Sequence, residues 1–262
     1  MLDDPALKSE SIYFATLSGE EVTHESIKQS IAQLFHASEA LGLFDHAKIF
    51  VYLTGEGDYR NRMCLSKKET ISKEDINGWL LELRGTWGYN RPITLVFDIC
   101  RSNGNEQEAR MHHGIELISS CSAGQQSQAI RFKFNQDIPY SCFFLAFVIA
   151  SFDSSGGTTF SFKDEIERRL NQFIGLMRSN PSSNISEEIN EGPGPQEPDW
   201  SQAGNPSTFL ELAIMLSRTK IAREARALAI KYLPVEVYRY LLYSGIRNST
   251  RRPHNIPPPR CK

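Results

Sequence analysis

One cysteine stands where a sequence pattern typical of a buried strand meets a polar loop. Residues 93–97 (ITLVF) are apolar or β-branched. Asp98 follows directly, and Cys100 comes two residues later. In parallel α/β sheets, functional side chains gather at the carboxyl ends of strands. A cysteine in that place can act as a nucleophile if a nearby cation, usually a histidine, lowers the pKa of its thiol. Cys100 is therefore the first candidate for chemistry, and an inert buried thiol is the alternative.

Serines at a second predicted strand end are candidate contacts to a substrate. Ser120 ends the apolar stretch 114–120, and Ser122 lies at the start of the polar loop that follows. If this stretch is a neighbouring parallel strand, its carboxyl end lies beside that of residues 93–97. We therefore group Ser120 and Ser122 with Asp98 as candidate substrate-binding residues.

Two histidines are candidates for the general base that a nucleophilic Cys100 needs. His112 and His113 lie in the polar loop 101–113, close enough in sequence to fold back over the strand end. A base must come within hydrogen-bonding distance of the thiol. Histidines in loops are more often solvated, so a catalytic and an incidental role both stay open.

Composition limits the class of protein. The chain has 262 residues, 40% hydrophobic, with a formal net charge of −2, which suits one substantial domain and argues against nucleic acid as a partner. No stretch approaches 18 uninterrupted apolar residues, so we expect no membrane association through a spanning helix. The five cysteines are widely spaced without a CxxC pair, which predicts reduced thiols in a cytoplasmic or nuclear protein, without a metal site or cofactor.

Strand-like and helix-like segments alternate through the first two thirds of the chain. The alternation predicts an α/β fold with a mostly parallel sheet flanked by helices. The strands are expected at 11–17, 48–54, 93–97 and 114–120, and the helices at 24–42, from the capping box Ser72-x-x-Asp75 to Gly85, at 141–151 and at 162–177.

The remaining segments differ in composition. Residues 1–10 are polar and predicted to be disordered, and residues 11–178 form the α/β domain. Residues 179–206 contain five acids, five prolines and no Lys or Arg, which predicts a flexible linker. Residues 207–246 have apolar positions at helical spacing and predict a small C-terminal helical segment. Residues 247–262 are basic and proline-rich and are predicted to be disordered.

Three of these segments together resemble the caspase-like cysteine peptidases, especially metacaspases. The sequence IFVYLTGEGD resembles their strand and loop FYFSGHGD, and ITLVFDICRSNG resembles VxxDxCHSG. The sequence ELISSCSAGQQSQAI resembles the third strand and loop, of the type ISACxxDQxAxE. The motifs occur in the expected order and spacing, so the resemblance covers roughly residues 11–178 and implies a caspase-like fold.

The resemblance also implies roles for individual residues, and some residues of this chain depart from the family motifs. Cys100 matches the nucleophile, while Glu56 occupies the position of the catalytic histidine. A glutamate is negative at neutral pH and raises the pKa of a nearby thiol. The metacaspase acid that reads basic side chains falls near Ala123-Gly124, so this specificity is in doubt.

Domains of this family begin with a central strand and a helix, followed by a segment that residues 11–42 resemble. Only about ten residues precede residue 11 here, so we expect that first strand to be absent. A missing central strand leaves an exposed sheet edge, which invites association with another copy of the chain. A homo-oligomer through this edge is therefore an expectation.

Three hypotheses follow. The first is a caspase-like pseudoenzyme that binds a protein or peptide, and the second is a cysteine endopeptidase that uses Cys100 with His112 or His113 as a relocated base. The third, an unrelated hydrolase or nucleotide-binding domain, is ranked last because the chain has neither a G-x-S-x-G elbow nor a P-loop.

Overall fold

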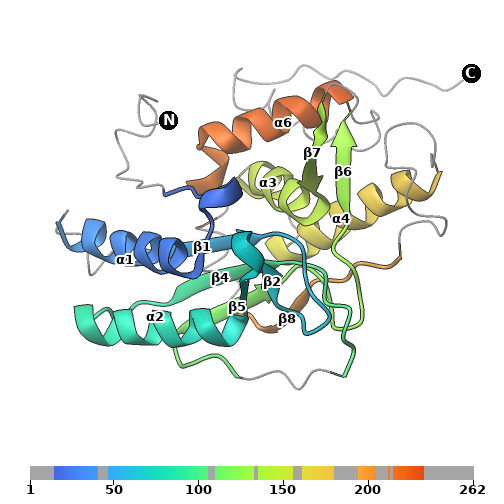
Figure 1. Ribbon diagram of the computed structural model, residues 1–262. Coiled ribbons are helices and arrows are strands. Elements are labelled where there is room, and N and C mark those ends of the chain that lie inside the picture. Colours follow the sequence, from blue (N-terminus) through green and yellow to red (C-terminus); the bar gives the residue numbers. More distant parts are fainter. Residues whose placement is uncertain are drawn as a thin grey trace, which may run out of the picture.

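A four-stranded sheet organises the computed structural model (Figure 1), which describes residues 15–40, 47–105, 110–132, 135–155, 161–179, 194–204, 212 and 215–232. The strand order is β1-β4-β5-β8. The first three strands are parallel, and β8 runs antiparallel to β5. These strands are β1 (Ile49–Thr54), β4 (Ile93–Asp98), β5 (Ile115–Ser119) and β8 (Asp199–Gln202). The predicted α/β class with a mostly parallel sheet is confirmed.

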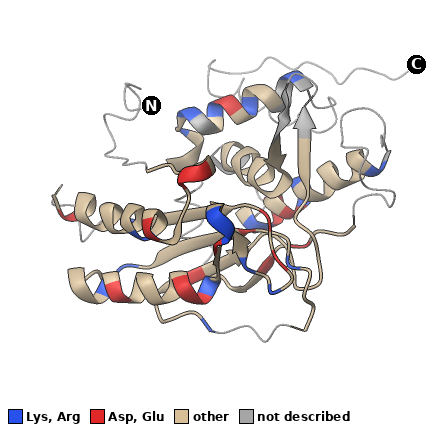
Figure 2. Cartoon of the chain, in the orientation of Figure 1, with Lys and Arg blue, Asp and Glu red and all other residues tan. Residues whose placement is uncertain are grey.

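Helices cover both faces of the sheet (Figure 1). On one face, α1 (His24–Ala40) and α2 (Lys73–Trp87) pack on side chains such as Leu95 and Phe97. On the other face, α3 (Cys142–Ser155) and α4 (Phe162–Ser179) pack on Val96 and Ile118. Alternate residues of β4 therefore belong to two hydrophobic cores, which is why its sequence is apolar throughout. Charged residues are sparse along the central strands and lie mostly on helices and loops (Figure 2).

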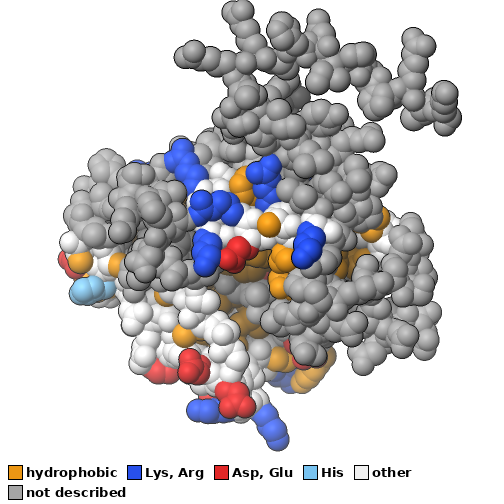
Figure 3. Space-filling model, turned by 90° about the horizontal axis from the view of Figure 1, so that it is seen from above, with side chains coloured by type: hydrophobic (Ala, Val, Ile, Leu, Met, Phe, Trp, Pro, Cys, Tyr) orange, Lys and Arg blue, Asp and Glu red, His pale blue; other side chains and the backbone are white. Residues whose placement is uncertain are grey.

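Short elements complete the described structure. Two 3-10 helices, two small antiparallel hairpins and one further helix surround the sheet: η1 (Gly19–Glu21), η2 (Ser66–Lys68), β2 (Met63–Cys64) with β3 (Thr70–Ile71), β6 (Ala129–Phe132) with β7 (Asn135–Ser141), and α6 (Lys220–Tyr232). Helix α6 buries Ala222 and Ala225 in the core beside α3. On this side of the molecule, Lys and Arg side chains gather on the described surface (Figure 3).

Helix α2 begins as predicted but ends later than expected. The Ser72 hydroxyl accepts from the Asp75 backbone N–H, and the Asp75 carboxylate accepts from the Ser72 N–H, so the capping box is confirmed. The helix continues through Gly85 and ends at Gly88, which adopts the left-handed conformation with φ 65°. A glycine inside a helix costs about 1 kcal/mol relative to alanine but does not end it; the left-handed C-cap does.

Two other expectations are wrong where the structure describes the residues. Residues 15–17 are not part of a strand, and residues 11–14 of the predicted strand 11–17 lie outside the described residues. The predicted linker 179–206 includes β8, which pairs with β5. The hairpin of β6 and β7 was not predicted at all. Strand β8 depends on a partner, β5, that is distant in sequence and that local composition does not reveal, whereas β6 and β7 pair with each other as a local hairpin.

Some expectations concern residues that the structure does not describe. These are the disorder of residues 1–10 and 247–262 and most of the helical segment 207–246 outside α6. Within the described part, β1 pairs with β4 alone and forms one edge of the sheet. The missing first strand and association through that edge remain predictions. None of the described helices has the length and apolar character needed to cross a membrane.

Candidate functional site

Three strand ends meet at one edge of the sheet. Thr54 of β1 pairs with Asp98 of β4, and Phe97 of β4 pairs with Ser119 of β5. Beyond these pairs, the Gly55 N–H donates to the Asp98 carbonyl (3.2 Å), and the Ser120 N–H donates to the Phe97 carbonyl (3.1 Å). The structure thus brings together the three loops that the sequence singled out.

Gly57 fixes the loop after β1 directly against Cys100. A Cβ atom on Gly57 would lie 2.0 Å from the Cys100 carbonyl oxygen, well inside any van der Waals contact. The backbone of Glu56 is held as well, because its carbonyl accepts from the Cys64 N–H (2.8 Å). Only a glycine at position 57 allows the Glu56 loop to approach Cys100 this closely.

The environment of Cys100 favours the protonated thiol. Its side chain is half-buried, and Sγ donates to the Ser127 carbonyl oxygen at 3.6 Å. Burial raises the pKa of the Cys100 thiol, and the negative charges of Asp98 and Glu56 raise it further. A thiol is a poor nucleophile until it is deprotonated, so a raised pKa works against nucleophilic chemistry at Cys100.

Asp98 is part of a buried hydrogen-bond network. The residue is 1% exposed. Its Oδ2 accepts from the Tyr52 hydroxyl (2.5 Å), and its Oδ1 accepts from the Ser127 hydroxyl (2.7 Å). Burial and the Asp98 charge raise the pKa of Tyr52 well above its usual range, so the phenol stays a donor. Asp98 thus links β1 to the loop after β5, and its contact with a substrate stays a prediction.

The two candidate serines lie in different environments. Ser120 is fully buried, and its hydroxyl has no hydrogen-bond partner among the described residues. The structure therefore does not expose Ser120 to a ligand, and its role in substrate binding stays a prediction. Ser122 is half-buried, lines a cleft, and donates its hydroxyl to the Glu197 carbonyl (3.0 Å). Ser122 thus remains a candidate for contacting a ligand.

His112 and His113 lie at the opposite end of the sheet from Cys100. The His112 carbonyl accepts from the N–H of Ile115, the first residue of β5, and the His113 carbonyl accepts from the Arg84 guanidinium. Because β4 and β5 are parallel with Ile115 opposite Ile93, seven residues of extended chain separate this point from Cys100, roughly 20 Å. A relocated base at either histidine is therefore wrong.

The segment that contains β8 is fastened to the loops of the site. Gln196 is buried. Its side-chain NH2 group donates to the Ser120 carbonyl (3.0 Å) and the Ser127 hydroxyl (3.3 Å), and its side-chain oxygen accepts from the Gln128 N–H (2.9 Å). The Glu197 N–H donates to the Gln125 side chain (2.8 Å). Backbone and side-chain groups of residues 120–128, which follow β5, thus hold residues 196 and 197 in place.

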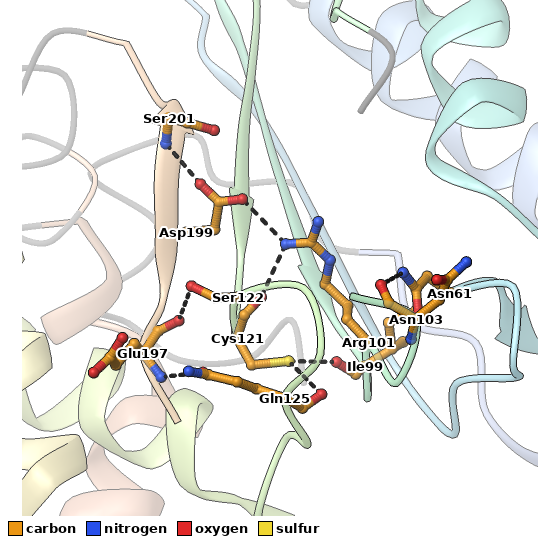
Figure 4. Close-up of polar contacts among 10 residues, drawn as sticks. All are labelled: Asn61, Ile99, Arg101, Asn103, Cys121, Ser122, Gln125, Glu197, Asp199 and Ser201. Atoms are coloured by element: carbon orange, nitrogen blue, oxygen red, sulfur yellow. Dashed lines mark hydrogen bonds and ion pairs between the residues drawn. The ribbon is translucent and has the colours of Figure 1, made fainter. Parts of the chain in front are cut away.

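A buried arginine completes this attachment (Figure 4). Arg101, 2% exposed, directs its guanidinium to the Cys121 carbonyl (3.0 Å) and to Asp199 Oδ2 (3.1 Å). Asp199 Oδ1 accepts from the Ser201 N–H (2.9 Å). These contacts, led by the backbone hydrogen bond from Ser201 and the ion pair with Arg101, outweigh desolvation and lower the pKa of the Asp199 carboxyl. Arg101, which follows the cysteine, is thus a structural cation and not an activator of the thiol.

A cleft of about 610 Å³ lies between this segment and α4. Gln196 in its wall contacts Ser127, whose carbonyl accepts from the Cys100 thiol, so the cleft adjoins the cysteine site. Sequence reasoning missed it because its wall falls in the expected linker; the one available signal was Trp200, an aromatic residue in an otherwise polar stretch. The lining comprises Ser122, Lys163, Glu167, Asn171, Gln196, Glu197, Pro198, Asp199, Trp200 and Ser201.

The remaining buried thiols are core residues. Burial raises the pKa of Cys121 to about 12 and raises that of Cys142 further above the usual range. Within the described part of the chain, no group of three or more His, Cys, Asp or Glu side chains is placed to hold a metal ion.

No protein-family model matches the chain, and a search of curated proteins found no match.

Proposed function

We propose that the chain is a caspase-like domain that lacks peptidase activity and acts by binding a protein or peptide. The observation that carries the proposal is that an acid, Glu56, lies in the loop that approaches Cys100, where the family has a histidine. The charges that act on the Cys100 thiol are those of two acids, Asp98 and Glu56. A carboxylate cannot form the ion pair with a thiolate that a histidine cation forms.

The positions of the described histidines support the same proposal. His24 and His36 lie on α1, where they contact Trp79 and Trp87. His112 and His113 lie at the far end of the sheet. Among the residues that the structure describes, no imidazole is placed to take a proton from Cys100.

The cleft beside the cysteine site supports the binding part of the proposal. Its volume is in the range of small-ligand and peptide side-chain pockets. Its wall is rigid, because residues 196, 197 and 199 are held by buried hydrogen bonds and an ion pair. A preformed wall binds a ligand without a large ordering cost.

Restoring the family histidine tests the proposal. In Glu56→His, the negative charge disappears and an imidazole lies beside Cys100, so we expect iodoacetamide to alkylate Cys100 at pH 7 at least about tenfold faster than in the unmodified chain. Glu56→Gln, the matched control, removes only the charge and should give a smaller increase. Rates are measured by intact-mass spectrometry with Cys100→Ala as the blank.

Hydrolysis of a mixed peptide library by the unmodified chain decides between the two functions. We expect no cleavage above that of Cys100→Ala. Cleavage that disappears in Cys100→Ala would contradict the proposal and favour the alternative, a cysteine endopeptidase. The partial exposure of Cys100 at a strand end is the observation that favours this alternative.

A further inference from the structure

Positive charge is concentrated on helix α6. Residues 218–231, which cover most of this helix and the residues just before it, contain five Lys or Arg and one acid, Glu224, whereas the whole chain has a net charge of −2. Lys and Arg side chains predominate on this side of the described surface (Figure 3). A nearly neutral chain thus has one basic face, which comprises Arg218, Lys220, Arg223, Arg226 and Lys231.

The helical spacing places most of this basic face in solvent. Lys220, Arg223 and Lys231 are exposed and lie on one side of α6, at helix positions i, i+3 and i+11. Ala222 and Ala225, on the opposite side, are buried in the core beside α3. Lys220 and Lys231 are roughly 16 Å apart along the helix axis. The fold therefore uses the apolar side of α6 and leaves an extended row of cations outside.

Two neighbouring side chains contact cations of the basic face. Glu224 Oε1 lies 3.6 Å from Lys220 Nζ, and both side chains are more than half exposed. An exposed pair of this kind is weak and is screened by salt, so Lys220 can exchange this contact for another anion. The Arg226 guanidinium lies over the Phe152 ring of α3, 5.0 Å from its centroid. This contact holds the guanidinium without removing its charge.

The shape and composition of the basic face limit the kind of partner. The exposed large hydrophobic side chains among the described residues are Tyr59 and Leu81, and neither lies on α6. The described side chains of this face thus give nucleic-acid bases no aromatic ring on which to stack. The exposed side of a single helix is convex, whereas peptides are recognised in grooves or at sheet edges. A broad anionic surface needs neither feature, because it attracts cations spread over a face.

From this arrangement we infer that the basic face of α6 docks the protein on an anionic lipid bilayer. Its Lys and Arg side chains contact the phospholipid headgroups, and α6 lies along the surface without inserting, because its apolar side packs in the core. The remainder of the chain has more acids than Lys and Arg, so repulsion elsewhere turns this face toward the membrane. The inference goes beyond the proposed function and does not depend on it.

Cosedimentation of the full chain with lipid vesicles tests the inference. The vesicles contain phosphatidylcholine alone, or about three parts phosphatidylcholine to one part phosphatidylserine. At an ionic strength of about 0.1 M, we expect the chain to bind the anionic vesicles at least about tenfold more tightly than the neutral ones. Binding should be lost at about 0.5 M salt, because salt screens the charges.

Variants of the basic face change its charge in both directions. Each Lys or Arg near an anionic surface strengthens binding by about fivefold. Arg223→Gln combined with Lys231→Gln should therefore weaken vesicle binding at least about tenfold, while Glu224→Gln should strengthen it by about two- to fivefold. Circular dichroism checks that each variant keeps the helix content of the unmodified chain.

The matched control removes two cations from a different surface. Lys67 and Lys68 are exposed on η2, which adjoins the core on the other face of the sheet. Lys67→Gln combined with Lys68→Gln gives the same change in net charge and should alter binding by less than about twofold. An equal loss in this control would overturn the inference, because net charge and not the basic face would then control binding. Vesicle binding that is unchanged in the Arg223 and Lys231 double variant would also overturn it.

Two soluble polyanions separate the bilayer from other anionic partners. A fluorescent single-stranded oligonucleotide and a polyglutamate peptide are titrated with the chain and followed by fluorescence anisotropy. We expect both to bind more weakly than the anionic vesicles at an equal concentration of negative charge. Tighter binding of either one, lost in the double variant, would overturn the bilayer as the partner and identify a nucleic acid or an acidic protein. The hydrolysis assay on Cys100 judges the proposed function separately.

Discussion

Arg101→Met is expected to lower the free energy of unfolding by about 2 to 4 kcal/mol. The guanidinium is buried, donates to the Cys121 carbonyl and pairs with Asp199. Methionine has a similar length but leaves that carbonyl and the Asp199 carboxylate without their donor. Breaking a buried pair from one side costs more than the pair contributes, because a desolvated charge remains. Urea denaturation followed by circular dichroism measures the change.

The variant Arg60→Met is the matched control. Arg60 is exposed and lies over the ring of Tyr59 at 5.1 Å from its centroid, so its loss should change stability by less than about 0.5 kcal/mol. Because Arg101 holds the β8 segment, Arg101→Met should also weaken binding in the cleft. Equal stabilities of the two variants would show that the ion pair does not hold this segment to the sheet.

Gly57→Ala is expected to lower the free energy of unfolding by about 3 kcal/mol. The added methyl group would lie 2.0 Å from the Cys100 carbonyl oxygen and 3.0 Å from its carbonyl carbon. Both atoms belong to the backbone, so the loop after β1 must move away from Cys100 to make room. The same displacement should separate Glu56 from the thiol, which makes the variant informative about the site.

A second glycine gives a control of opposite sign. Gly78 lies within α2, and a methyl group added there meets no atom within 4 Å. Gly78→Ala should therefore raise stability by about 0.5 to 1 kcal/mol, because alanine is the better helix former. If Gly57→Ala were as stable as the unmodified chain, the close approach of the two loops would not exist in solution.

Local patterns in the sequence predicted several helices and strands of the fold. Helix α1, the start of α2 and strands β1, β4 and β5 follow from apolar spacing and the capping box at Ser72, all of which are local signals. The grouping of Glu56, Cys100 and Ser122 at one sheet edge also followed, because parallel strands place their carboxyl ends together.

The errors have different physical causes. Residues 196–202 have an acidic, proline-containing sequence typical of a linker, yet Gln196 and Asp199 are held by groups some 70 to 100 residues earlier in the chain. Long-range contacts of this kind override local composition. The positions of His112 and His113 instead follow from the strand direction: their loop returns to the start of β5, and β5 runs parallel to β4, so these residues lie at the end of the sheet opposite to Cys100.

The pH dependence of Cys100 alkylation tests the central claim most directly. Alkylation requires the thiolate, and the pKa of Cys100 is raised by burial and by the charges of Asp98 and Glu56. The rate, with Cys100→Ala as the blank, should therefore stay low through neutral pH and rise with an inflection above the free-cysteine value of about 8.5. An inflection well below that value would mean that a cation activates the thiol, and it would contradict the account of an inactive domain.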